Sequence, residues 1–373
     1  MTLDNRYLRP LPFTLGVVIA AAILLYIGNF IADARSLAQG LEADSLGSQP
    51  FGEGGILTGW GTWLVVAGII VYGLYLTAAE QPIWKVGTRE VVYMALGAAL
   101  FGLLSWAFNA VPVPAVGNVA LRPTIVIPIF FGFAFGPVVG FFTGFMGNVL
   151  GDALTAWGVF PVWDIANGLV GLIPGLVLMF KDKSKSLNTL MWVGVAALAI
   201  ATVLAFLAPD DITDFGGTAV NTLWWIPLLG IALLLVINFV PRLWPILMGI
   251  LLLGLAWGAI ISFIRGAIGA GILMLALTLI GAGMAYMLYS RRESIAEALS
   301  DIDTKTIIVW GVLANVIGIG FAAFADIWVS GLTPIAAFAG EFVPAAGPNI
   351  LFAILLAPLL YGAWKQAQLQ SGR

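Results

Sequence analysis

Amide and carboxylate side chains stand inside or beside the long apolar stretches of this 373-residue chain, where polar groups are rare. Asn148 and Asp152 end a glycine-rich run, and Asp164 and Asn167 open the helix that follows it. Polar groups at membrane depth are costly and usually serve a purpose. Because a ligand pocket combines an apolar wall with a few placed polar groups, we expect these residues to bind a small molecule.

All the candidate substrate-binding residues except Asn315 gather at one membrane face in the topology that the basic residues indicate. Arg122 is the best single candidate, because an arginine on the outer side opposes the usual distribution of basic residues. The full set is Asn109, Asn118, Arg122, Asn148, Asp152, Trp157, Trp163, Asp164, Asn167, Asn315, Asp326, Glu341 and Asn349.

Simpler roles are open to several of these side chains. Trp157, Trp163 and the nearby Trp328 have the residue type of an interfacial aromatic belt. Asp152 and Asp164 have the type of a helix N-cap. Both interpretations stand beside ligand binding at this point.

Several kinds of chemistry are excluded by residue type. The chain has no cysteine and no histidine, which removes disulfides, thiol catalysis and thiolate or imidazole metal sites. No Walker-type phosphate loop occurs, so any ATP that drives this protein is hydrolysed elsewhere. We therefore expect no enzyme activity, no cofactor, no metal and no nucleic-acid partner.

The composition is that of a membrane protein. Hydrophobic residues make up 61% of the chain and charged residues 9%, with a mean hydropathy of +1.04, whereas soluble domains carry about 25% charged residues. Most uncharged runs reach the roughly 20 residues that span a bilayer as helix, and none alternates like a barrel strand. The prediction is an all-α, polytopic transmembrane bundle. The runs are 14–32, 55–79, 91–121, 123–151, 186–209, 215–241, 243–264, 266–290, 306–325 and 342–364.

The basic residues indicate how the helices cross, because Lys and Arg favour the cytoplasmic side. The run 123–151 is long for one span and short for two, and its Gly136-Pro137 pair is a natural helix breaker. Two crossings place the basic cluster at 181–185 inside, so we predict two. About twelve crossings of the cell membrane follow, with both termini cytoplasmic and only Arg35, Arg122 and Arg265 of the basic residues outside.

Small residues recur at helical spacing in two segments. Glycine stands at every fourth position from 132 to 144 and again at 147 and 151, although it costs about 1 kcal/mol against alanine in a soluble helix. In lipid, such spacing lets two backbones approach closely. The ladder indicates either tight packing within one bundle or a smooth face that slides against a partner. Ala95, Ala98, Ala99 and Gly102 are predicted to form a second face of this kind.

Four motifs occur in order along the chain: "REVVYMALGAALFGLLSW" (89–106), "FGFAFGPVVGFFTGFMGNVLGDAL" (131–154), "FPVWDIANGLVGLIPGLVLMF" (160–180) and "GEFVPAAGPNILFAILLAPLLYGAWK" (340–365). Together they resemble the S component of an energy-coupling factor (ECF) transporter, with the riboflavin-type subgroup nearest. That family has an alanine-rich first helix, a Gly-Pro-x-x-Gly-x-x-x-Gly helix and a Tyr/Phe-Pro-x-Trp turn.

The resemblance implies a function and partners. Such subunits bind a vitamin or similar micronutrient from outside the cell, and their first outer loop, here within 109–122, folds over the ligand. They dock on a transmembrane coupling protein with two cytoplasmic ATPases and topple in the bilayer to release the ligand. The family's docking motif on its first helix, Ala-x-x-x-Ala, is matched by Ala95 and Ala99.

The resemblance also divides the chain into four parts. Residues 1–84 would be two extra N-terminal helices, and 85–185 the first four helices of a six-helix S-component-like core. Residues 186–305 would be a four-helix insertion of unknown role, and 306–373 the last two core helices. Alternatively, the resemblance ends at Phe180.

Two other functional classes fit parts of the sequence. A secondary transporter would show paired repeats with broken helices, and a membrane-embedded enzyme or assembly factor would turn Asp152, Asp164 and Asp326 toward one cavity. For the transporter subunit, the polar set predicts a small heterocyclic ligand. Arg122 favours an anionic or carbonyl group on the ligand, whereas the carboxylates favour a cationic ring. The sequence leaves the sign of the ligand's charge open.

Overall fold

The computed structural model describes residues 10–38, 60–78, 81–158, 160–180, 182–214, 216–264 and 301–370, with some residues between 268 and 286. Within these ranges every regular element is helical, apart from two isolated β-bridges. The elements are α2 (Pro10–Ala38), α3 (Trp60–Ala78), η2 (Pro82–Trp84), α4 (Thr88–Phe108), η3 (Pro123–Ile125), α5 (Val126–Phe135), α6 (Pro137–Thr155), α7 (Pro161–Gly175), η4 (Leu176–Met179), α8 (Lys183–Phe206), η5 (Val220–Leu223), α9 (Trp225–Phe239), η6 (Pro241–Leu243), α10 (Trp244–Ile264), α13 (Ile302–Val329), α14 (Pro334–Ala337), η7 (Phe338–Phe342) and α15 (Val343–Gln370).

The predicted all-α, polytopic bundle is confirmed. Four more apolar helical segments of the described chain are shorter, and the predicted run 266–290 lies mostly outside the described residues, so the number of crossings stays a prediction. Seven described segments are long and apolar enough to cross a membrane: Thr88–Phe108, Pro137–Thr155, Pro161–Met179, Ser186–Phe206, Val220–Phe239, Ile302–Val329 and Pro334–Lys365.

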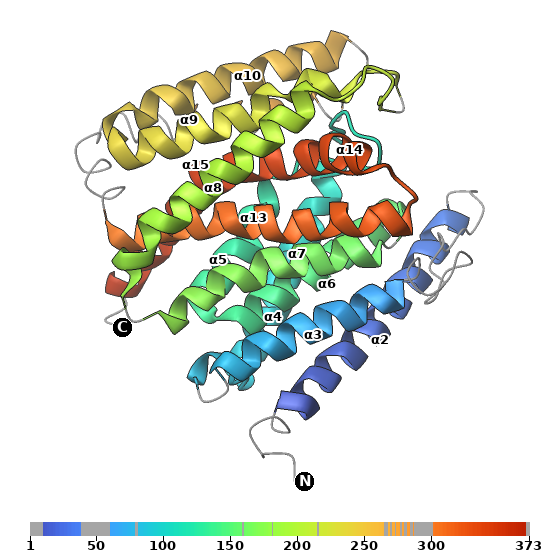
Figure 1. Cartoon of the computed structure of the whole chain (residues 1–373), viewed down its shortest axis with the longest axis vertical. Helices are drawn as coiled ribbons and strands as arrows, with labels where there is room; N and C mark the ends of the chain where they lie inside the picture. The colour runs from blue at the N-terminus through green and yellow to red at the C-terminus, as the bar shows by residue number, and fades with distance from the viewer. Residues whose placement is uncertain are drawn as a thin grey trace.

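The helices lie alongside one another, and their connections gather at two opposite ends of the bundle (Figure 1). Segments 109–122, 207–219 and 330–333 meet at the end we call the cleft end. At the opposite end, Lys365 Nζ lies 3.4 Å from Asp301 Oδ2 and joins the start of α13 to the last turns of α15. An apolar cluster ties the cleft-end segments together: Val116, Ala208, Ile212, Val220, Ile335 and Ala339.

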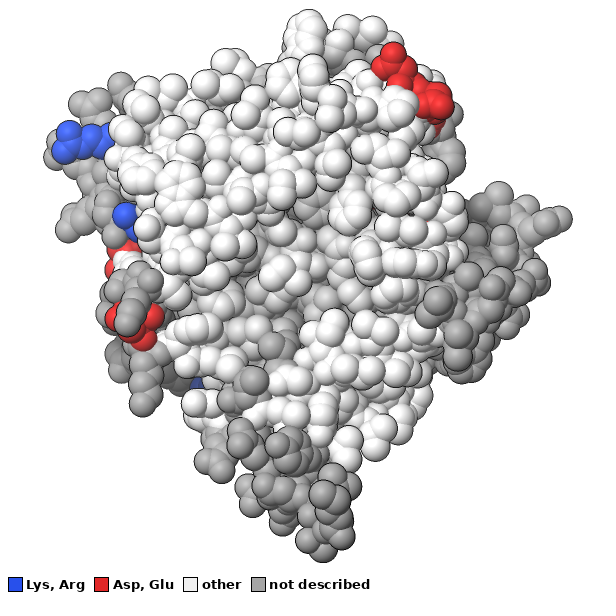
Figure 2. Space-filling model, in the orientation of Figure 1, with Lys and Arg blue, Asp and Glu red and all other residues white. Residues whose placement is uncertain are grey.

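The sides of the bundle are apolar. In Figure 2 the charged side chains that are visible lie at the edges of the face, and the broad area between them is uncharged. Leu253, in the middle of α10, is 73% exposed, which is unfavourable in water and favourable against lipid tails. The exposed surface of the helices is therefore suited to a bilayer.

The chain breaks at Gly136, as the Gly-Pro pair predicts. Gly136 has φ of 108°, a backbone conformation that glycine adopts without the penalty paid by other residues, and Pro137 begins α6 at the position where a helix tolerates proline. Gly132 of α5 contacts Gly140 of α6 across the break. Since residues eight apart are about 12 Å apart in one continuous helix, α5 and α6 fold back on each other.

The glycine ladder packs within the bundle. Gly140 of α6 and Gly171 of α7 approach so closely that a Cβ atom on either would overlap the backbone carbonyl of the other, and one on Gly132 would overlap Gly171 as well. Further along α6, Gly144 meets the carbonyl of Asn167, and Gly147 meets the ring of Phe101 on α4. The tight-packing interpretation is confirmed, and the sliding-face interpretation is wrong because these glycines are buried on both sides.

The predicted four-residue face on α4 is packed against the bundle along one half only. Ala98 and Gly102 are buried toward α6, where a Cβ atom on Gly102 would lie 2.8 Å from Leu150 Cβ. Ala95 and Ala99 are exposed. At about 100° per residue the four residues lie within one arc of the helix, so α6 covers Ala98 and Gly102 and leaves Ala95 and Ala99 at the exposed edge of the same face.

The remaining helices cover the central ones. Helices α5, α6 and α7 contact one another, α13 packs on α7, and α15 packs on α13 and α5. Helices α2 and α3 lie against α6 and α7, whereas α8 packs on α13, and α9 on α15 (Figure 1). The four-part division of the chain stays a prediction.

Replacing Gly140 by alanine should destabilise the protein, because the new methyl group meets backbone that cannot move aside. Overpacking of this kind costs about 1–3 kcal/mol. We expect a lower midpoint of thermal unfolding for the purified protein in detergent. The matched control is Gly249→Ala in α10, where nothing lies within 4 Å of the new Cβ position. Equal midpoints for the two variants would contradict the close contact of α6 with α7.

Candidate functional site

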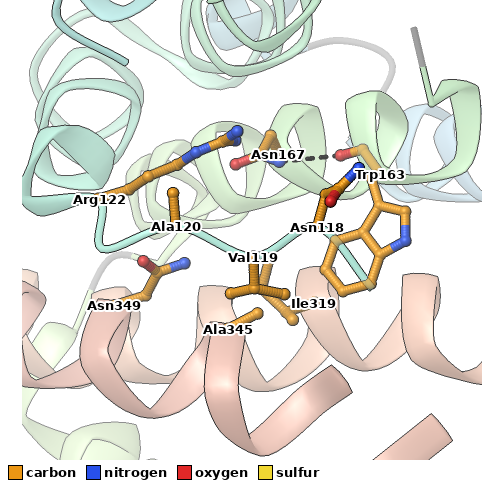
Figure 3. A pocket seen from close by; sticks show the side chains of 9 residues that line it. All are labelled: Asn118, Val119, Ala120, Arg122, Trp163, Asn167, Ile319, Ala345 and Asn349. Carbon is orange, nitrogen blue, oxygen red and sulfur yellow. Dashed lines mark hydrogen bonds between the residues drawn. The ribbon is translucent and has the colours of Figure 1, made fainter. Parts of the chain in front are cut away.

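A cleft opens at the cleft end of the bundle, between the loop 109–122 and the helices beneath it (Figure 3). The empty space in it, including the open solvent at its mouth, is about 350 Å³. The loop, α7, α13 and α15 all contribute to its wall. The lining residues are Asn118, Val119, Ala120, Arg122, Trp163, Asn167, Ile319, Ala345 and Asn349.

The loop is held in place by its own backbone. Val113 N–H donates to Val119 O at 2.9 Å and Leu121 N–H to Val111 O at 2.8 Å, so the two halves of the loop run antiparallel. At the tip, Val116 N–H donates to Gly340 O at 2.9 Å and fastens the loop to η7. The returning half of the loop therefore presents Asn118 and the residues that follow it to the cleft.

Arg122 is the centre of a buried polar network. Its guanidinium donates to Asp152 Oδ1 at 2.6 Å and to Asn109 Oδ1 at 3.0 Å, and it also bonds to Asn148 Oδ1. Trp157 lies with its ring centroid 6.0 Å from the guanidinium carbon, within the range of a cation–π contact. The protein itself thus supplies acceptors on each of the three guanidinium nitrogens.

Asn148 extends this network from α6 to α7. Its Nδ2 donates to Asp152 Oδ2 at 2.9 Å and to Asp164 Oδ1 at 2.8 Å, while Asn109 Nδ2 donates to Thr155 Oγ1 at 2.8 Å. Asp164 Oδ2 is buried without a hydrogen-bond partner. The N-cap interpretation is wrong for both aspartates: α7 begins after Phe160, and Asp152 lies near the end of α6.

A second set of bonds fixes the other side of the cleft. Trp163 Nε1 donates to Asp326 Oδ2 at 2.7 Å, and Ser330 Oγ donates to Asp326 Oδ1 at 2.9 Å. Asn167 Nδ2 donates to Trp163 O at 2.9 Å. Trp163 bonds to a buried carboxylate and lines the cleft, so the belt interpretation is wrong for it; Trp328 is partly exposed and packs on Trp63.

The predicted site residues divide into groups. Those that line the cleft are Asn118, Arg122, Trp163, Asn167 and Asn349. Those in the polar network or beside it are Asn109, Asn148, Asp152, Asp164 and Trp157. Asp326 and Glu341 lie behind the wall, and Asn315 is buried within α13, where its Nδ2 donates to Gly311 O at 2.9 Å. Their contact with a ligand stays a prediction.

Part of the wall was not predicted. Val119, Ala120, Ile319 and Ala345 line the cleft, but apolar residues in an apolar chain carry no signal of such a role. Ser330 could have been found, because it follows Asp326 at a spacing of four, the distance at which polar side chains on a helix meet.

The carboxylates do not converge on a catalytic centre in the described part of the chain. Asp152 and Asp164 share the network of Arg122, whereas Asp326 bonds to Trp163 on the other side of the cleft, and none of the three lines it. Among the described residues no group of three or more Asp or Glu side chains is arranged to hold a metal ion.

Removing Arg122 alone should cost more stability than removing Arg122 together with the charge of Asp152. In the single variant, two buried carboxylates lose the only cation that the described residues supply to them. Breaking a buried pair costs about 3–5 kcal/mol. We expect Arg122→Gln to lower the thermal midpoint strongly, and the double variant Arg122→Gln/Asp152→Asn to recover part of the loss. Strictly additive effects of the two substitutions would show that the pair is not coupled.

The comparison with known proteins agrees with the motifs. Residues 85–214 match a family model described as "ECF-type riboflavin transporter, S component", a range that runs from just before α4 through α8. A UPF0397 protein of Vibrio atlanticus is 40% identical over 91 residues, covering 24% of this chain and 49% of the relative. UPF0397 proteins of Aliivibrio fischeri and Aliivibrio salmonicida are each 37% identical over 92 residues, which cover 25% of this chain and 49% of each relative.

The chain thus spans about half the length of the curated relatives it matches. No solved structure matches it. The resemblance drawn from the motifs is confirmed for the part of the chain that forms the loop, α7 and the polar network: residues 85–214 are similar to the S component of ECF-type riboflavin transporters.

Proposed function

We propose that this chain is the substrate-binding membrane subunit of an ATP-driven uptake transporter for a vitamin-like micronutrient. The observation that carries the proposal is the S-component match over residues 85–214, since that segment supplies the loop and the α7 side of the cleft. The UPF0397 names of the relatives state no function.

The cleft suits a small heterocycle. Val119, Ala120, Ile319 and Ala345 supply apolar wall, and the indole of Trp163 offers a flat surface for a ring. The amides of Asn118, Asn167 and Asn349 supply hydrogen bonds that fix its orientation. In this proposal the cleft end faces the outside, both termini lie in the cytoplasm, and the protein resides in the cell membrane.

The partners follow from what the chain lacks and what it exposes. It has no phosphate loop, so ATP is hydrolysed by separate cytoplasmic ATPases that act through a transmembrane coupling protein. Ala95 and Ala99 are exposed on α4, next to each other on one side of the helix. Small residues permit the close approach of a partner helix, so we assign this side of α4 to the coupling protein.

Ligand binding can be tested with the purified full chain. We expect a vitamin-like heterocycle to copurify and to be identified by mass spectrometry after extraction. Asn349→Ala should lower its retention about 3- to 10-fold through the loss of one hydrogen bond. The control is Asn188→Ala, at an exposed position of α8 outside the cleft. Retention that is unchanged in Asn349→Ala would mean that the compound binds elsewhere.

The energy source separates this proposal from the alternatives. Uptake that requires the ATPases supports an S component, uptake driven by an ion gradient alone would indicate a secondary transporter, and activity without uptake would indicate an enzyme or assembly factor.

Docking has its own test. Ala95→Leu and Ala99→Leu should leave ligand retention intact while reducing both copurification with the coupling protein and uptake, because larger side chains prevent close approach. The matched controls are Ala196→Leu and Ala199→Leu at exposed positions of α8. If ligand retention falls together with uptake, then Ala95 and Ala99 support the bundle itself.

A further inference from the structure

Asp326 and Glu341 form a buried acidic pair behind the wall of the cleft. Asp326 is 4% exposed and Glu341 is 5% exposed, and their carboxyl groups interact with each other. In the described part of the chain neither residue takes part in a salt bridge. Glu341 Oε2 is buried and has no hydrogen-bond partner. The hydrogen bond between the two carboxyl groups requires a proton on one of them, and Asp326 also accepts from Trp163 and Ser330. An acidic oxygen that is buried without a partner is costly, so Glu341 Oε2 is the oxygen of the pair that can accept a further hydrogen bond.

The pair lies at a defined end of the cleft. Glu341 precedes the lining residues Ala345 and Asn349 at successive intervals of four. Its Oε1 lies against the loop, where a Cβ atom on Gly117 would be only 2.7 Å away, and the next residue, Asn118, lines the cleft. Asp326 holds the indole of Trp163. In Figure 3, Asn118 and Trp163 mark one end of the cleft and Arg122 marks the other.

The backbone around Glu341 is unusual. Phe338–Phe342 form a π-helical turn between α14 and α15, and such turns are rare and frequent at functional sites. The same turn receives the tip of the loop through the bond from Val116 N–H to Gly340 O. The acidic pair is therefore placed where the loop, α13 and the start of α15 meet.

Arg122 does not balance this charge. Its guanidinium is engaged by Asn109, Asn148 and Asp152, and its network contains Asp164 as a further acidic group. The described residues in and directly behind the cleft wall thus include one basic side chain and four acidic ones. This excess of acidic over basic side chains favours a positively charged ligand, whereas the sequence alone leaves the sign of the ligand's charge open.

We infer that the ligand carries a protonated nitrogen or amino group, which the Asp326–Glu341 pair binds at the Trp163 end of the cleft. This inference rests on the proposed function and names the class of its substrate. Glu341 supplies the free acceptor, and Asp326 supplies charge while it keeps Trp163 in position. A ring bearing the cationic group then lies against the indole, as cations and aromatic faces favour.

The experiment measures binding of three labelled probes to the full chain by equilibrium dialysis: thiamine as a cation, riboflavin as an uncharged molecule and biotin as an anion. The compound that copurifies is identified in parallel. Wild type should prefer thiamine, and the copurifying compound should carry a protonated nitrogen. Glu341→Gln, which keeps the size of the side chain, should lower binding of the cationic compound about 10- to 100-fold, as expected for a charge-assisted hydrogen bond.

The control variant is Glu90→Gln, on the first turn of α4 at the opposite end of the bundle, and thermal unfolding shows whether each variant is folded. Preference for riboflavin or biotin, or Glu341→Gln binding equal to wild type, overturns the inference and leaves the proposed function standing. Retention of ²²Na⁺ that is lost in Glu341→Gln, with no preference among the probes, overturns it in favour of an inorganic cation. If no compound copurifies and no probe binds, both proposals fail.

Discussion

The fold depends on the point where three backbones meet without side chains between them. Gly132 of α5, Gly140 of α6 and Gly171 of α7 lie in mutual contact, and no other residue type fits at these positions. In a bilayer, helices gain little from the hydrophobic effect against each other, so close van der Waals contact must hold them. The sharp reversal at Gly136 makes this meeting possible, since it turns α5 back along α6. All helices that line the cleft are arranged around this contact.

The same closeness explains why polar groups can be buried at the cleft end. With α6 held tightly to α4 on one side and to α7 on the other, Asn148 can reach Asp152 and Asp164 at once. A looser bundle would leave these groups without partners in an apolar medium, at a cost of several kcal/mol each by order of magnitude. Arg122 then enters from the loop and closes the network. The close packing of the backbones and the hydrogen bonding of the buried polar side chains thus both follow from one arrangement of helices.

The sequence predicts helical class, the break at Gly136 and the position of the polar residues at one end, because each of these depends on local pattern. The side chains that each residue contacts come from other helices, so a local pattern does not reveal them. Nothing in the spacing of Asp152 and Asp164 distinguishes a helix cap from a network in which Asn148 bonds to both. The four small residues of α4 also look alike in the sequence, although α6 covers only Ala98 and Gly102. The apolar lining of the cleft was invisible for a simpler reason: Ile319 and Ala345 are ordinary members of ordinary apolar helices.

Helices that do not line the cleft also support the functional end. Trp63 of α3 packs with Val162 and Ala166 of α7 and with Ala322 and Ala325 of α13, the residues that flank Trp163 and precede Asp326. The helix pair α2–α3 therefore supports the two helices whose bond, Trp163 to Asp326, shapes one side of the cleft. On the far flank, α8 and α9 press on α13 and α15 in the same way. A cleft whose wall is braced from both flanks holds its indole and its carboxylates in fixed positions, which is what selective binding of a small molecule requires.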